Sequence, residues 1–66
     1  MSIGSTIKRL RRERDLTQEQ LAEKSGVSRV TIAMLETRKD YDTTTRTLLK
    51  IANALGTTVD NLFIDL

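Results

Sequence analysis

The side chains best suited to chemistry in this chain of 66 residues gather in the segment 29–37. Arg29 stands near the start of the segment, and Val30, Ala33 and Met34 follow at intervals that place them on one face of a helix. An arginine can donate two hydrogen bonds to O6 and N7 of a guanine, and an apolar side chain can contact a thymine methyl group. These residue types on one helix face therefore indicate contacts with base edges in the major groove of DNA. The alternative for Val30 and Met34 is a protein–protein contact, or simple tolerance of single exposed apolar residues.

The composition gives little support to catalysis. The chain has no cysteine and no histidine, so it lacks thiolate and imidazole metal ligands and the commonest general base. Asp40 and Asp42 could bind a cation, but two carboxylates in a loop are more often only solvated. We expect a protein that is not an enzyme and that binds no metal and no cofactor.

Charge and hydropathy are consistent with a nucleic-acid partner without requiring one. Eleven basic residues oppose nine acidic ones, and the segment KRLRRER at 8–14 is strongly basic. A basic cluster can face a polyanion, although the simpler interpretation is a solvated helix face. No apolar run approaches the roughly 20 residues that cross a bilayer, and residues 1–4 do not begin a signal peptide. We expect a cytoplasmic protein with no membrane contact, associated with the nucleoid when it binds DNA.

Apolar residues recur with helical spacing throughout, which predicts an all-α fold in a single domain, residues 1–66. The predicted helices cover about 3–14, 18–25, 29–37, 45–55 and 59–63. Thr17 and Gln20 form a capping-box pattern, and Asp15 is expected to end the first helix in a left-handed conformation. Val59, Leu62 and Phe63 are expected to close the core.

Residues 18–37 have the pattern of two helices joined by a tight turn. Gly26 supplies the positive φ that a sharp turn requires, and Ala22 is expected where the two helices cross closely. Ser28 is expected to cap the helix that follows. The pattern predicts a helix-turn-helix. The simpler alternative is a helical hairpin in a small bundle, which we consider less well supported because of the uncharged outer face described above.

The segment LTQEQLAEKSGVSRVTI, together with TLLKIANALG, resembles the xenobiotic-response-element family of helix-turn-helix proteins. The lambda, 434 and P22 repressors and the Cro proteins belong to this family. The resemblance extends from about residue 3 to residue 63. It implies a five-helix, lambda-repressor-like domain that binds double-stranded DNA as a dimeric transcriptional regulator, most often a repressor. The helix at 29–37 would read a palindromic operator in the major groove.

The resemblance also implies roles for single residues. The implied base contacts are Arg29, Val30 and Met34, and the implied contacts with the DNA backbone are Thr17, Gln18, Ser28, Thr31, Thr37 and Lys39. Arg11 and Glu36 match a charged pair that ties the first helix to the third. The chain departs from the family pattern at Asp15, where glycine is common, and in the loop 40–44, which lacks the usual proline and carries two acids.

The C-terminal end is the predicted dimer interface. Four of the last five residues are apolar, namely Leu62, Phe63, Ile64 and Leu66, which is more than one short helix can bury in a small core. Alternatively, Leu62 and Phe63 belong to the core and the rest is a frayed end. A second possible function is that of an antitoxin or a restriction–modification controller, which would also bind a protein partner.

Overall fold

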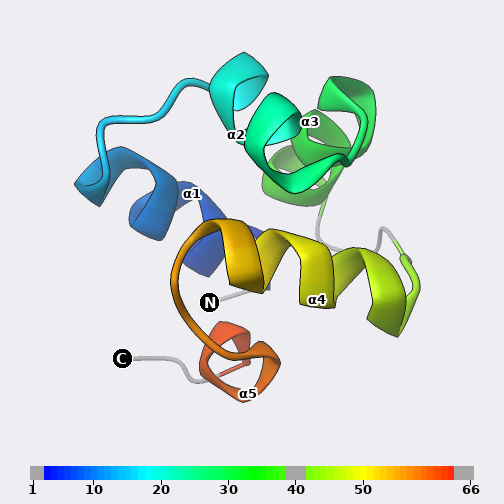
Figure 1. Cartoon of the computed structure of the whole chain (residues 1–66). Helices are drawn as coiled ribbons and strands as arrows, with labels where there is room; N and C mark the ends of the chain where they lie inside the picture. Colours follow the sequence, from blue (N-terminus) through cyan, green and yellow to red (C-terminus); the bar gives the residue numbers. More distant parts are fainter. Residues whose placement is uncertain (1–2, 39–41, 64–66) are drawn as a thin grey trace.

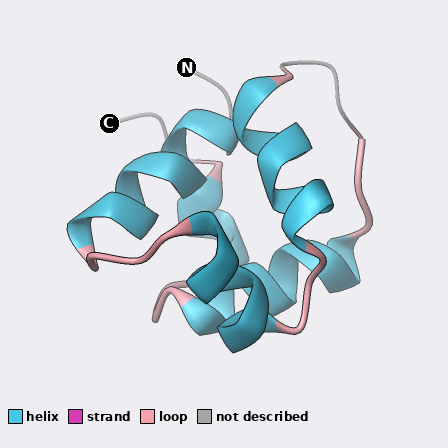
Figure 2. Ribbon diagram, turned by 90° about the horizontal axis from the view of Figure 1, so that it is seen from above, coloured by secondary structure: helices cyan, strands magenta, loops and turns pink. Residues whose placement is uncertain are grey.

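The computed structural model of the chain describes residues 3–38 and 42–63, and these residues form helices but no strand (Figures 1 and 2). The helices are α1 (Ile3–Glu13), α2 (Gln18–Ser25), α3 (Arg29–Thr37), α4 (Thr45–Ala54) and α5 (Val59–Leu62). The predicted five-helix, all-α fold is therefore confirmed. α2 and α3 lie together at one end of the molecule, and α4 passes between this pair and α5 (Figure 1).

Hydroxyl side chains begin four of the helices. Thr17, Ser28, Thr44 and Thr58 each accept a hydrogen bond from the backbone N–H of the residue three positions later. At α2 the bond is reciprocated, because the Gln20 side chain accepts from the Thr17 N–H at 2.9 Å. These contacts satisfy N–H groups that have no partner within the helix. The N-terminal bounds of α2 to α5 therefore follow from local sequence.

The helix ends differ from the sequence-based prediction by one residue in α1, α4 and α5. In α4 the N–H of Leu55 donates to both Ile51 O and Ala52 O, at 3.0 and 3.1 Å. Such bifurcated bonds are typical of a helix that tightens at its last turn. Asp15 has a φ of 55°, as predicted for the residue that turns the chain after α1. It is the one non-glycine residue with positive φ among the residues described.

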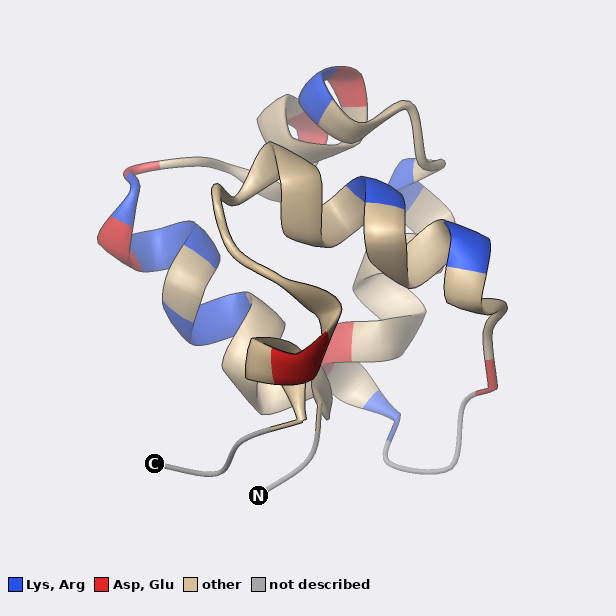
Figure 3. Ribbon diagram, turned by 60° about the horizontal axis from the view of Figure 1, so that its bottom comes forward, with Lys and Arg blue, Asp and Glu red and all other residues tan. Residues whose placement is uncertain are grey.

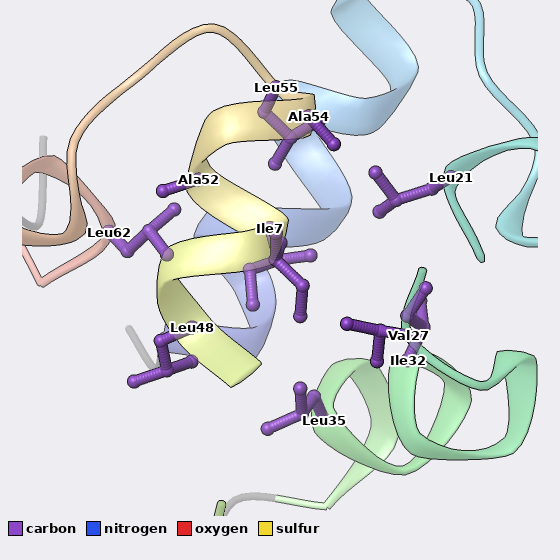
Figure 4. Close-up of a cluster of buried hydrophobic side chains, with 11 residues drawn as sticks. Ile7, Leu21, Val27, Ile32, Leu35, Leu48, Ala52, Ala54, Leu55 and Leu62 are labelled. Atoms are coloured by element: carbon purple, nitrogen blue, oxygen red, sulfur yellow. The ribbon is translucent and has the colours of Figure 1, made fainter. Parts of the chain in front are cut away.

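Side chains from every helix meet in one core (Figure 4). The largest of those with less than 2% of their area exposed are Ile7, Leu21, Ile32, Ile51, Leu55 and Leu62. Burying a leucine or isoleucine side chain stabilises a fold by roughly 1.5–3 kcal/mol. These residues therefore fix the relative positions of α1 to α5.

Two predictions about the C-terminal segment need correction. Phe63 was expected to close the core, but 64% of its area is exposed. Leu62 was expected at a dimer interface, but its side chain is fully buried within the single chain. Because α5 has only one turn, it can direct only part of its apolar side chains inward. Leu62 takes the inward position, and Phe63 faces outward.

α1 and α3 lie too close together at Gly4 to admit a side chain. A Cβ atom added to Gly4 would overlap Leu35 O and lie 2.8 Å from Leu35 C and 3.2 Å from Glu36 Cα. Real Cβ atoms essentially never come this close to backbone, so only glycine fits. Ala22 was expected at the crossing of α2 and α3, and it is half-buried and packs against the core. The close crossing of α1 and α3 at Gly4 is a separate contact that was not predicted.

Within residues 3–38 and 42–63, no helix is long and apolar enough to cross a membrane. Nor do these residues bring together three or more carboxylates, or other side chains of the ligating types, in a group that could hold a metal ion.

Candidate nucleic-acid interface

The turn between α2 and α3 depends on Gly26. Its φ is 75°, and its N–H donates to Ala22 O at 2.9 Å, which ends α2. An added Cβ would meet nothing within 4 Å. The backbone conformation, and not lack of space, therefore favours glycine here. The sharp turn is what allows α3 to leave α2 at an angle and present its outer face.

α3 begins abruptly after this turn. Ser28 accepts a hydrogen bond from the Thr31 N–H at 3.2 Å, and Val27 before it is buried in the core. The Ser25 hydroxyl accepts from the Val27 N–H at 3.1 Å and so links the end of α2 to the turn. The first residue of α3, Arg29, is exposed. The N-terminal end of α3 therefore lies at the surface with its arginine accessible.

The predicted base-contacting residues occupy different depths. Val30 has 70% of its area exposed, and Arg29 is exposed as well. Met34 is half-buried, so it is less accessible than the helical projection predicted. Ile32 and Leu35 face the core on the opposite side of α3. The outer face of α3 thus combines an arginine with uncharged side chains.

The predicted DNA-backbone contacts lie on α2, on α3 or on their N-terminal caps, except for Lys39. Thr17 and Ser28 are exposed at the starts of α2 and α3, and Thr37 is exposed at the end of α3. The Thr37 hydroxyl donates to Ala33 O at 2.7 Å. Thr31 is half-buried. Lys39 lies outside the described residues.

Arg11 and Glu36, the predicted charged pair, meet in two hydrogen bonds. Arg11 Nε donates to Glu36 Oε2 at 2.8 Å, and Arg11 Nη2 donates to Glu36 Oε1 at 3.0 Å. A third donor, Arg11 Nη1, reaches Leu16 O at 2.7 Å. The hydrogen bond to Glu36 raises the pKa of Arg11 above its ordinary value, against the smaller opposing effect of burial. The pair joins α1 to α3 and also holds the segment that enters α2.

Sequence reasoning missed a further contact of this pair. Gln18 was assigned to a DNA phosphate, but its Nε2 donates to Glu36 Oε1 at 3.1 Å. Glu36 therefore accepts hydrogen bonds from both α1 and α2 while 1% of its side chain is exposed. No spacing rule predicts this contact, since the two residues lie 18 positions apart. The start of α2 is thereby fixed relative to α3.

The sequence profile of the helix-turn-helix family HTH_3 matches residues 7–62. The chain belongs to this helix-turn-helix family. The match includes α2, α3 and the turn between them. The predicted membership of this family is confirmed, and with it the fold of a DNA-binding transcription regulator.

Relatives of this helix-turn-helix protein include a repressor, a transcriptional regulator and a control protein. The immunity repressor protein of Bacillus phage phi105 is 48% identical over 56 residues, which is 85% of this chain and 38% of that protein. An HTH-type transcriptional regulator of Methanocaldococcus jannaschii is 46% identical over 50 residues, covering 76% of this chain and 74% of that protein. The control protein C.SmaI of Serratia marcescens is 40% identical over 60 residues, covering 91% and 70%. The chain therefore spans well under half the length of the phage repressor and about 70% of the other two.

A solved structure has the same fold. The SinR protein/SinI protein complex contains a chain that matches with a TM-score of 0.88 and 28% identity. The match covers 96% of this helix-turn-helix protein and 61% of the other chain. The five-helix arrangement therefore occurs in a solved structure as well.

The structure describes two of the four predicted dimer residues, and these two differ in exposure. Leu62 is fully buried and Phe63 is exposed. Ile64 and Leu66 lie outside the described residues. Of the predicted interface, only Phe63 is therefore shown to be accessible.

Proposed function

We propose that this protein is a dimeric transcriptional repressor that reads a palindromic operator by placing α3 in the major groove. The observation that carries the proposal is the outer face of α3, where Val30 is 70% exposed beside an exposed Arg29. Within the described part of the chain, Arg29 forms no hydrogen bond or ion pair that would occupy its guanidinium. Its donors are available to a base.

The neighbouring helix provides the contrast. The exposed positions of α2 include Glu19, Glu23 and Lys24, as expected of a face that meets only water. On α3 the one acidic residue, Glu36, is turned inward to Arg11. An uncharged helix face with an arginine at its N-terminal end suits a guanine edge and neighbouring thymine methyl groups. We therefore assign base contacts to Arg29 and Val30, and a peripheral one to Met34.

Contacts with the DNA backbone would surround this helix. Thr17 and Ser28 stand at the N-terminal ends of α2 and α3, where backbone N–H groups and the helix dipole favour anions. We propose phosphate or sugar contacts for Thr17, Ser28, Thr31 and Thr37. One N–H of the Gln18 side-chain amide is held by Glu36, so a phosphate contact from Gln18 would use the second amide N–H or the backbone N–H. Lys39 keeps its proposed role, although it lies outside the described residues.

A palindromic operator requires two copies of the protein. Two recognition helices must lie about 34 Å apart to enter successive major grooves on one side of the duplex. Phe63 supplies an exposed aromatic side chain for the contact, and Ile64 and Leu66 follow it in sequence. Leu62 is not part of this proposal, because its burial in the core leaves it no surface to share.

Selection of binding sites from a random duplex library tests the proposal. The purified protein should enrich an inverted repeat, whereas Arg29→Ala should enrich a repeat with relaxed preference at one base pair of each half. Lys24→Gln, which removes an exposed cation from α2, is the matched control and should return the wild-type sequence. Recovery of no common sequence by the wild-type protein would refute the proposal.

A second function is favoured by one comparison. The control protein C.SmaI matches nearly the whole chain. This match favours the function of a restriction–modification controller that also binds a protein partner. The matched solved structure likewise pairs its protein with another. Sedimentation of the purified chain separates the two. A concentration-dependent dimer that is lost in Phe63→Ser supports the homodimer, and a monomer at every concentration supports a different partner.

A further inference from the structure

An open groove of about 490 Å³ runs along the outer side of α1 where this helix meets the end of α3. Its lining residues are Ser5, Lys8, Arg9, Arg12 and Glu13 from α1 and Glu36 from α3. Figure 3 shows basic positions along α1 in this part of the molecule. From sequence alone, the simpler interpretation of these basic residues is a solvated helix face.

The two acidic residues of the groove are already neutralised. Glu36 is held by Arg11 and has 1% of its side chain exposed. Glu13 lies 3.4 Å from Arg9 and 3.9 Å from Arg14. By contrast, Lys8 and Arg12 form no ion pair with any of the described residues. Within the described part of the chain, the groove therefore carries two cations whose charge is not matched by a neighbouring carboxylate.

These two cations stand next to each other. Residues four apart on a helix share a face, with Cβ atoms about 5–6 Å apart. Such spacing lets Lys8 and Arg12 contact neighbouring phosphates of one strand. The groove also adjoins the proposed interface, because Glu36 contacts Gln18 at the start of α2. A strand passing the N-terminal end of α2 would continue along this edge of α3 toward α1.

We propose that Lys8 and Arg12 bind phosphates of the DNA strand that passes along this edge of α3. The inference rests on the proposed function and extends the interface from the helix-turn-helix to α1. An acidic protein segment is the less suitable occupant, because protein interfaces have an apolar centre. The exposed large apolar residues of the described chain are Val30, Leu49 and Phe63, and none of them lines the groove.

The dependence of DNA affinity on salt concentration tests the proposal. Each phosphate contact adds about 0.9 to the slope of log affinity against log salt concentration. Arg12→Gln should make the slope shallower by about 0.9 for each bound chain, and Lys8→Gln with Arg12→Gln by about 1.8. Lys24→Gln is the matched control, since it makes the same change of charge on α2 and should leave the slope unchanged. Circular dichroism melting of each variant establishes that it is folded. If the double variant does not fold, the single variant Arg12→Gln still tests the proposal, because Arg12 is exposed.

Two duplexes separate this proposal from the proposed function. One carries the sequence recovered by selection, and the other has a mixed sequence of the same length. Loss of the two cations should change the slope on both duplexes and leave the ratio of their affinities unaltered, because phosphates carry no sequence information. If the wild-type protein prefers no sequence, the proposed function fails, while the slope on mixed DNA still tests the groove. A slope equal to that of Lys24→Gln would overturn the inference. So would unchanged DNA binding together with lost binding of a polyglutamate peptide, which would assign the groove to an acidic protein segment.

Discussion

Glu36→Ala should be the most damaging substitution of a charged residue in this protein. Glu36 accepts two hydrogen bonds from Arg11 and one from Gln18. Its removal leaves Arg11, with 10% of its side chain exposed, without its charged partner. Breaking a buried ion pair on one side costs about 3–5 kcal/mol, because a desolvated charge remains uncompensated.

The lower end of that range applies here. Arg11 keeps its hydrogen bond to Leu16 O and retains some contact with water, so we expect a loss of about 3 kcal/mol in the free energy of unfolding. A domain of this size shifts its melting temperature by about 4–8 °C per kcal/mol. The expected fall is therefore at least about 12 °C, measurable by circular dichroism or calorimetry.

A double variant tests whether the unpaired charge of Arg11 causes this loss of stability. Replacing both partners with apolar residues, Arg11→Met with Glu36→Leu, should cost less than Glu36→Ala alone, because no charge is left buried. The exposed pair Arg9 and Glu13 serves as the control, and Glu13→Ala should cost under about 1 kcal/mol. If Glu36→Ala costs no more than Glu13→Ala, the network does not hold α1, α2 and α3 together, and the reasoning is wrong.

Three further predictions concern α1 and the helix-turn-helix. Gly4→Ala should lower the free energy of unfolding by about 1–3 kcal/mol, measured in urea, because its Cβ overlaps the backbone of α3; a stabilised variant would contradict the close crossing. Gly26→Ala should cost about 1–2 kcal/mol through its positive φ alone, and Gly26→Asn should cost less if conformation is the cause. The difference in stability between wild type and Arg11→Met should be constant from pH 7 to 10. The raised pKa of Arg11 means that its contribution is complete below its ordinary value and is lost only as the pH rises through the raised one; a difference that shrinks by pH 10 would refute this.

Local sequence was sufficient to predict the helices. The caps at Thr17 and Ser28 and the turn at Gly26 depend on residues within four positions of one another. The left-handed Asp15 follows from the same kind of reasoning. Arg11 and Glu36 could be paired because the family resemblance supplied a contact across 25 positions.

Contacts that depend on how the helices pack could not be predicted from spacing. Gly4 is required only because α1 crosses α3 at the backbone of Leu35. The bond from Gln18 to Glu36 depends on the same packing. For Phe63 and Leu62, an apolar pair at the end of a one-turn helix gives no periodicity that says which side chain is buried. The placement of α1 relative to α3 is therefore the information that the sequence pattern lacked, and the proposed phosphate contacts at Lys8 and Arg12 depend on it.

Comparing the affinities of the wild-type protein and Arg29→Ala for two duplexes tests the central claim most directly. One duplex carries the selected site and the other a scrambled sequence, and both are titrated by fluorescence anisotropy at one fixed salt concentration. The account predicts that wild type prefers its site by at least about 1,000-fold. It also predicts that Arg29→Ala reduces this ratio roughly 5- to 150-fold for each half-site arginine lost, which corresponds to about 1–3 kcal/mol of binding free energy. Equal ratios for the two proteins, or a wild-type protein that does not discriminate between the duplexes, would contradict base recognition by α3.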